Sequence, residues 1–425
     1  MINNIVLQHK LEKDKFLSEV YIPREKLDFA HKFLDTNLIK VIMGSRRVGK
    51  SVFSMLFLKD KEFAYLNFDD ENILKIKNYD EILKAIFEIY PSVKLILFDE
   101  IQNLKNWELF VNRLQRRGFN LILTGSNANL LNKELSTSLT GRYVPIEIFP
   151  FSFKEFLQVK GFKISEAEIG LPESKGKILN YTHEYLKTGG FPEVVVHNLE
   201  PNTYLATLFD SILLRDVVKR YKVKFTQKIY DLAVYLVTNF SSEFSYTKLR
   251  NILGFRSTNT VEKYLKYLEE SYLVFSLNRF SYKIKEQIKT PRKIYTLDNG
   301  FIAAKSFQFS SNIGRLMENL VFVEILRRGY KLNKDVFYYK SDNTCEVDFV
   351  LRKGLKVEKL IQVCYDVSAG SVKDRELKGL IKAADELNCE DLIVIDWDYD
   401  AQEDFKGKQI TFIPLWKWLV EDKSM

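Results

Sequence analysis

Cysteine and histidine are scarce in this chain, which has three cysteines and four histidines among its 425 residues. Cys345, Cys364 and Cys389 lack the paired spacing of zinc ligands and suggest no disulfide framework. The scattered histidines indicate neither a zinc site nor a histidine-based catalytic triad. These absences argue against a disulfide-rich secreted fold and favour a reducing environment, so we expect a cytoplasmic protein.

Long apolar runs are missing as well. No stretch approaches the ~20 apolar residues that a membrane-spanning helix needs, and the N-terminal residues lack the pattern of a signal peptide. The formal net charge of +8 is modest for a chain of this length, so contact with nucleic acid is permitted but not required. We therefore expect no membrane partner and roughly two to four soluble domains.

The most informative feature that is present is a phosphate-binding loop. Residues 44–51 read Gly-Ser-Arg-Arg-Val-Gly-Lys-Ser and match G-x-x-x-x-G-K-S/T at every fixed position. A β-rich run precedes them and an apolar helical run follows, so backbone N–H groups at a helix N-terminus would form an anion site. The alternative, a chance glycine turn, is disfavoured by this context. Lys50 is expected to reach the β- and γ-phosphates of ATP, and Ser51 to hold Mg²⁺. The residues expected to bind the nucleotide and its metal are Gly44, Ser45, Arg46, Arg47, Val48, Gly49, Lys50, Ser51 and Asp99.

Two adjacent carboxylates follow a second apolar run, at residues 95–100. A continuous apolar run is typical of a central parallel strand. Asp99 is expected to help hold Mg²⁺ beside Ser51, and Glu100 to act as general base toward the attacking water. A solvated strand end is the alternative interpretation. Because the pair lies downstream of a complete phosphate loop, we favour the catalytic one.

Five further residues are candidates for contact with the γ-phosphate. Three of them, Thr124, Ser126 and Asn127, end the next apolar run and are candidates to sense the phosphate or orient water. The alternative is an ordinary helix N-cap at this turn. Phosphoryl transfer also calls for a positive group, for which Arg142 and Arg215 are the candidates, from the same chain or a neighbouring subunit. Either arginine has a surface salt bridge as its alternative role.

In combination, these motifs resemble an archaeal and bacterial AAA+ ATPase family whose members carry an AAA domain followed by the domain of unknown function 4143. The resemblance also rests on residues 149–156 and 189–193 and extends over nearly the whole chain. It implies an α/β fold in which a doubly wound parallel P-loop sheet is joined by a helical lid, a winged helix-turn-helix and a restriction-endonuclease-like α/β domain. A homo-oligomer is among the expected states. The expected domains are an AAA+ core (1–160), a linker and helical lid (161–225), a winged helix-turn-helix (226–298) and a nuclease-like domain (299–425).

The winged-helix segment carries many basic residues. Helix-cap spacing at Ser245 and at Ser257 is compatible with a recognition helix in a DNA major groove, whereas the alternative is a module that packs on the ATPase without touching DNA. The residues predicted to form a basic face are Arg256, Lys263, Lys266, Arg279, Lys283, Lys285, Lys289, Arg292 and Lys293.

The C-terminal segment resembles a PD-(D/E)XK nuclease core with an altered site. Such a core would bind Mg²⁺ through Glu318, Asp348 and an acid at position 362, with a lysine at 364 to activate water. This chain has Gln362 and Cys364 instead, and Lys340 is a candidate substitute for the lysine. We therefore expect a degenerate site that serves binding or assembly, with active nuclease chemistry as the alternative.

Taken together, the sequence predicts an ATP- and Mg²⁺-binding AAA+ ATPase. Hydrolysis is expected to change the angle between the sheet domain and the lid, and the protein is expected to act on or near double-stranded DNA. Two alternatives stay open: an ATP-dependent nuclease, and an ATP-bound switch or assembly scaffold that does not hydrolyse.

Overall fold

The computed structural model describes residues 2–126, 141–163, 171–306, 312–341, 345–367 and 370–421. By its contacts, the chain divides into two compact units. The N-terminal unit comprises residues 1–149 with 270–272, and the C-terminal unit comprises 150–269 with 273–425. No described helix is both long enough and apolar enough to cross a membrane.

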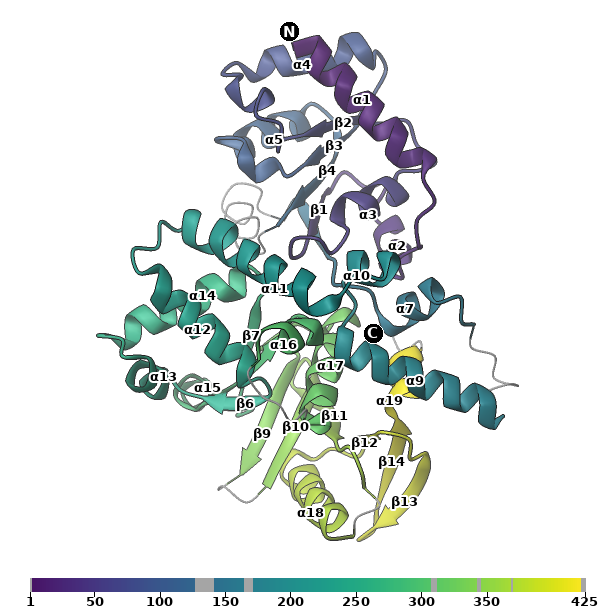
Figure 1. Cartoon of the computed structure of the whole chain (residues 1–425), viewed down its shortest axis with the longest axis vertical. Helices are drawn as coiled ribbons and strands as arrows, with labels where there is room; N and C mark the ends of the chain where they lie inside the picture. The colour runs from purple at the N-terminus through teal and green to yellow at the C-terminus, as the bar shows by residue number, and fades with distance from the viewer. Residues whose placement is uncertain are drawn as a thin grey trace. The chain divides into compact units, whose positions relative to one another are not determined.

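The N-terminal unit is built on a five-stranded parallel sheet in the order β2-β3-β4-β1-β5 (Figure 1). Met43 pairs with Gly125, and Asn67 with Asp99, so strands β1 to β4 end at one common edge. The prediction of a parallel P-loop-type sheet is thereby confirmed. The strands are β1 (Ile39–Met43), β2 (Ala64–Asn67), β3 (Leu95–Asp99), β4 (Asn120–Gly125) and β5 (Tyr143–Glu147).

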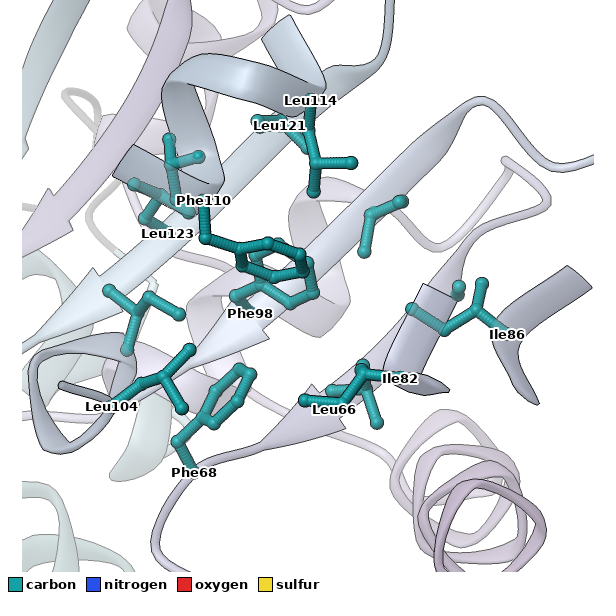
Figure 2. Close-up of a cluster of buried hydrophobic side chains, with 14 of the residues drawn as sticks. Leu66, Phe68, Ile82, Ile86, Phe98, Leu104, Phe110, Leu114, Leu121 and Leu123 are labelled. Carbon is teal, nitrogen blue, oxygen red and sulfur yellow. The ribbon is translucent and has the colours of Figure 1, made fainter. Parts of the chain in front are cut away.

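Helices cover both faces of this sheet. On one face, apolar side chains of α4 and α5 pack on those of the strands, as Figure 2 shows for Ile82, Phe98, Phe110 and Leu123. Because side chains alternate along a strand, Asp99 and Thr124 face the opposite side from Phe98 and Leu123. The helices of this unit are α1 (Ile2–Ser18), α2 (Lys26–His31), α3 (Lys50–Phe57), α4 (Tyr79–Ile89) and α5 (Trp107–Arg116), with short 3₁₀ turns η1 (Ile73–Lys75) and η2 (Ile101–Asn103).

The C-terminal unit begins with a group of helices. A capping box between Ser152 and Glu155 opens the first of them, because each side chain satisfies an otherwise unpaired backbone N–H. Helix α9 ends at Gly189, whose φ of 73° is in the left-handed region that glycine favours. These elements are α7 (Phe153–Val159), α9 (Pro172–Thr188), α10 (Pro192–His197), α11 (Pro201–Ile212) and the π-helical turn η3 (Leu213–Lys219).

A small three-stranded antiparallel sheet, in the order β6-β8-β7, follows in the same unit. Strand β8 lies between β6 and β7 and pairs with both. Serine caps the helix that begins at Tyr246, as its sequence position predicts. The elements are α12 (Thr226–Thr238), β6 (Ser242–Phe244), α13 (Tyr246–Leu253), α14 (Thr258–Glu270), β7 (Val274–Asn278), α15 (Ile284–Lys289) and β8 (Arg292–Thr296).

The last part of the C-terminal unit is a six-stranded mixed sheet in the order β13-β14-β12-β11-β10-β9 (Figure 1). Helices α17 and α18 lie on opposite faces: Phe349 of β10 contacts Phe322 of α17, whereas its neighbour Val350 packs with Leu380 of α18. This second sheet confirms that an additional C-terminal α/β region follows the ATPase-like sheet. The elements are α16 (Asn299–Lys305), α17 (Ile313–Arg327), β9 (Val336–Ser341), β10 (Cys345–Lys353), β11 (Lys356–Val363), α18 (Gly370–Leu387), β12 (Leu392–Asp396), β13 (Ala401–Phe405), β14 (Lys408–Pro414) and α19 (Leu415–Val420).

Candidate nucleotide site

The phosphate loop joins the end of β1 to the start of α3, as its sequence predicts. Two glycines make the turn possible. A Cβ atom on Gly44 would lie 2.2 Å from the carbonyl oxygen of Ile148, and Gly49 has a φ of 89° directly before helix α3. The loop therefore leads its backbone into a helix N-terminus, where unpaired N–H groups favour an anion.

Arg24 fastens the loop from outside the motif. Its guanidinium donates to the Val48 carbonyl oxygen at 2.9 Å and to that of Phe149 at 2.7 Å, and the side chain is buried. Sequence analysis missed this residue, because nothing near Arg24 in the chain distinguishes it from a surface arginine. Its role is to hold the loop in shape.

Lys50 occupies the position expected of the phosphate-binding lysine. Its side chain is buried at the start of α3, where the ammonium donates to the Ser45 carbonyl oxygen at 3.0 Å and lies 3.7 Å from Glu100 Oε1. The hydroxyls of Ser45 and Ser126 are buried as well and have no hydrogen-bond partner among the described residues. Buried polar groups are seldom left unpaired, so these two hydroxyls suit a site that receives a polar ligand.

Asp99 lies at the end of β3 with both oxygens engaged. Its carboxylate accepts hydrogen bonds from Thr124 and, at 3.3 Å, from the Tyr65 hydroxyl, and it also bonds Ser51. Burial and the nearby Glu100 charge raise the pKa of Asp99, and the bonds to Thr124 and Ser51 oppose the shift. A serine hydroxyl beside a carboxylate is a hard oxygen donor set of the kind Mg²⁺ prefers, with phosphates and water completing the shell.

Glu100 follows directly, with a φ of 51° that turns the chain away from the strand. Its backbone N–H donates to the Thr124 hydroxyl at 3.0 Å, and Gln102 donates to its carboxylate. Thr124 thus holds both members of the carboxylate pair, which places the Glu100 side chain toward Lys50 and away from the sheet core. This geometry leaves a carboxylate beside the Lys50 ammonium.

Asp69 is a further acid of this site, and the sequence analysis predicted no role for it. It follows β2, the strand next to β3, and accepts a hydrogen bond from Asn103 at 2.6 Å. Burial and the neighbouring Glu100 raise the pKa of Asp69, while Arg46 and Lys50 oppose the shift. The available signal was its place after a strand, at the same sheet edge as Glu100.

Among the remaining predicted residues, Arg142 is described within the same unit and lies away from this site. Arg142 precedes β5, and its carbonyl oxygen accepts from Ile39 N at the first residue of β1, so it lies at the sheet edge opposite the phosphate loop. The prediction that Arg142 contacts the γ-phosphate of its own chain is therefore wrong, because an arginine side chain cannot reach along the full length of β1 to the loop. Arg215 is exposed on η3 in the C-terminal unit, and Asn127 lies outside the described residues.

A second predicted cluster does assemble, in the C-terminal unit. Glu318 of α17, Asp348 of β10 and Gln362 of β11 come together, and Asp348 N donates to Gln362 Oε1 at 3.2 Å. Lys293, which was predicted to lie on an exposed basic face, is instead buried among these acids. That prediction is wrong because the strand β8 faces α17 and not solvent at this position.

Comparison with known proteins assigns families to most of the chain. An AAA domain family matches residues 36–157, a domain of unknown function (DUF8612) matches 179–311, and a second (DUF4143) matches 313–418. Among solved structures, the chain is similar to a Walker-type ATPase of Pyrococcus abyssi, with 13% identity, a TM-score of 0.45 and coverage of 67% of this chain and 95% of that one.

Two curated relatives extend over nearly the whole chain. An uncharacterized protein of Methanocaldococcus jannaschii is 38% identical over 400 residues, covering 90% of this chain and 88% of that protein. An uncharacterized protein of Haemophilus influenzae is 33% identical over 421 residues, covering 94% and 99%. With the phosphate loop and parallel sheet in place, this chain belongs to the family of AAA-domain ATPases in which DUF4143 follows the AAA domain.

Proposed function

We propose that the N-terminal unit hydrolyses ATP with Mg²⁺ at the edge of its parallel sheet. One observation carries the proposal: the Lys50 ammonium lies between the Ser45 carbonyl oxygen and the Glu100 carboxylate, in a loop that continues into a helix N-terminus. A γ-phosphate arriving there would meet a cation, backbone N–H groups and a carboxylate able to take a proton.

Each residue has a distinct task in this proposal. When ATP binds, the Lys50 ammonium would move from Glu100 to the β- and γ-phosphates. The Glu100 carboxylate would then be free to accept a proton from the attacking water. Thr124 keeps Glu100 aimed by holding its backbone N–H. Mg²⁺, held by Ser51 and Asp99, would neutralise developing charge on the phosphate oxygens. We further propose that turnover is coupled to a rearrangement of the C-terminal unit.

Lys50→Ala is expected to weaken ATP affinity by about 10- to 100-fold, because charge-assisted hydrogen bonds contribute roughly 1.5–3 kcal/mol. Binding of a fluorescent ATP analogue and release of phosphate measure the two steps separately. Lys59→Ala, which alters an exposed lysine just after α3, is the matched control and should behave as wild type. Unchanged affinity and turnover in Lys50→Ala would refute the proposal, and tight ATP binding without turnover in the wild type would favour the non-hydrolysing switch.

Contact with duplex DNA is a second proposed function, which one observation favours. Lysines 263 and 266 project from α14 into solvent, and further exposed basic side chains lie nearby in sequence. Positive side chains of this kind contact phosphates without regard to sequence. The exposed basic residues of this segment are Lys248, Arg256, Lys263, Lys266, Lys283, Lys285 and Lys289.

The double variant Lys263→Glu/Lys266→Glu is expected to weaken duplex binding by at least about 10-fold. It should also reduce the slope of log affinity against log salt by about 2, one unit for each lost phosphate contact. Fluorescence anisotropy with a labelled duplex measures both quantities. Lys378→Glu/Lys382→Glu on α18 makes the same charge change on another exposed helix face. Equal losses in both double variants would indicate a net-charge effect and not a DNA-binding face.

A further inference from the structure

Lys293 is enclosed by three carboxylates. It lies on β8, in the middle of the three-stranded sheet, and only 3% of its side chain is exposed. Its ammonium is 2.9 Å from Glu318 Oε1, 2.9 Å from Asp348 Oδ1 and 2.7 Å from Glu346 Oε1. Burial opposes a charged lysine, but these carboxylates outweigh it and hold the pKa of Lys293 well above its usual value.

Two of these acids, Glu318 and Asp348, are ones that a PD-(D/E)XK core would use for Mg²⁺. Glu318 Oε1 and both oxygens of Asp348, however, already have partners. Besides Lys293, the Tyr295 hydroxyl donates to Glu318 Oε1 at 2.6 Å, and Val363 N donates to Asp348 Oδ2 at 3.0 Å. Among the residues that the structure describes, no group of three or more acidic, histidine or cysteine side chains is arranged to hold a metal ion. The expected ligand set therefore does not fit a divalent cation.

The protein instead supplies a positive group of its own at this point. The ammonium of Lys293 donates to three acceptors, which is the full number of hydrogen bonds that it can make. Lys340, half-buried, adds a second positive charge 3.5 Å from Glu346 and 2.8 Å from Glu243. Two ammonium groups thus face four carboxylates and offset part of their negative charge, as the burial of these acids requires.

Residues near the C-terminal end of β8 are also held by hydrogen bonds to neighbouring elements. Asn319 of α17 accepts from Thr296 N at 2.8 Å and donates to Thr296 O at 3.1 Å. Asp298, just beyond β8, accepts from Gly190 N at 2.8 Å and so reaches the segment that follows α9. The strand is therefore held by buried polar contacts along its C-terminal half and beyond, to α17 and to the α9–α10 turn.

We infer that Lys293 takes the place of the catalytic metal, so that the C-terminal α/β region is a metal-independent module whose carboxylate cluster clamps β8 to α17 and β10. The three-stranded sheet, the turn after α9 and the six-stranded sheet then form one body. In this arrangement Glu318 and Asp348 are engaged with Lys293 and would not hold the metal that a nuclease reaction needs.

The first test needs no variant. In the full-length, nucleotide-free protein, MnCl₂ at millimolar concentration and EDTA should each leave the thermal midpoint of the C-terminal unit unchanged, and electron paramagnetic resonance should find no Mn²⁺ bound there. Metal binding that raises the midpoint and disappears in Asp348→Asn would overturn the inference.

The second test removes the internal cation. Lys293→Met should lower the thermal midpoint by roughly 5–15 °C, because the variant leaves buried carboxylates without their partner. Adding Glu318→Gln and Asp348→Asn to it should recover much of the loss, since two of the buried negative charges left by Lys293→Met are then removed. Lys340→Met, at the less deeply buried neighbouring lysine, should change the midpoint by less than about 3 °C. An unchanged midpoint in Lys293→Met, or no recovery in the combined variant, would contradict the clamp.

Discussion

Glu100→Gln should slow ATP turnover by about 10²- to 10⁴-fold, the usual contribution of a general base, while ATP continues to bind. Glutamine keeps the size of the side chain and can still bond Gln102, but it cannot take a proton from water. Lys50, 3.7 Å from the Glu100 carboxylate, remains available for the phosphates. Single-turnover phosphate release, with ATP affinity measured in parallel, separates the two effects.

Two comparisons sharpen this experiment. Glu71→Gln changes an exposed acid of the same unit and should leave turnover unchanged. Asp69→Asn changes another acid near Lys50. Should Asp69→Asn abolish turnover while Glu100→Gln retains it, the general base has been assigned to the wrong carboxylate.

Gly189→Ala is expected to destabilise the C-terminal unit by about 3 kcal/mol or more. A Cβ atom at this position would lie 1.6 Å from Asp298 Oδ1, and the φ of 73° is one that alanine adopts only with strain. Asp298 cannot move aside without losing its bonds to Gly190 N and Gly300 N. Thermal unfolding of the full-length variant measures the effect.

The same helix offers a control for this variant. Gly176 lies inside α9, is exposed, and has no atom within 4 Å of the place where a Cβ would stand. Gly176→Ala should therefore stabilise the helix by roughly 0.5–1 kcal/mol. A wild-type midpoint for Gly189→Ala would mean that the backbone does not approach Asp298 as closely as described.

Much of the nucleotide site was predictable because its chemistry is local in the chain. One contiguous loop supplies the proposed phosphate contacts, and the adjacent pair Asp99 and Glu100 lies at the end of a neighbouring parallel strand. Parallel strands end at a common sheet edge, so these residues meet without any knowledge of the full tertiary structure. The parallel sheet was predictable for the same reason, from apolar strand runs that end in polar residues.

The supporting residues were not predictable from local pattern. Arg24 acts on the loop through carbonyl oxygens 24 and 125 residues further along the chain. The position of Arg142 is decided by strand register alone. Strand β5 runs parallel to β1, so the first residues of β5 lie at the sheet edge away from the loop. A motif identifies residue types, whereas register decides which end of the sheet they occupy.

By itself, the sequence determined that this protein has a phosphate loop with paired carboxylates on a parallel sheet, since backbone N–H groups and strand order alone build that site. Only the tertiary structure decided the role of Lys293. In the sequence it is one lysine in a basic segment, and it becomes an internal cation because folding brings it to acids 25 and 55 residues away. Burial among three carboxylates is a property of packing, and no local pattern in the chain encodes it.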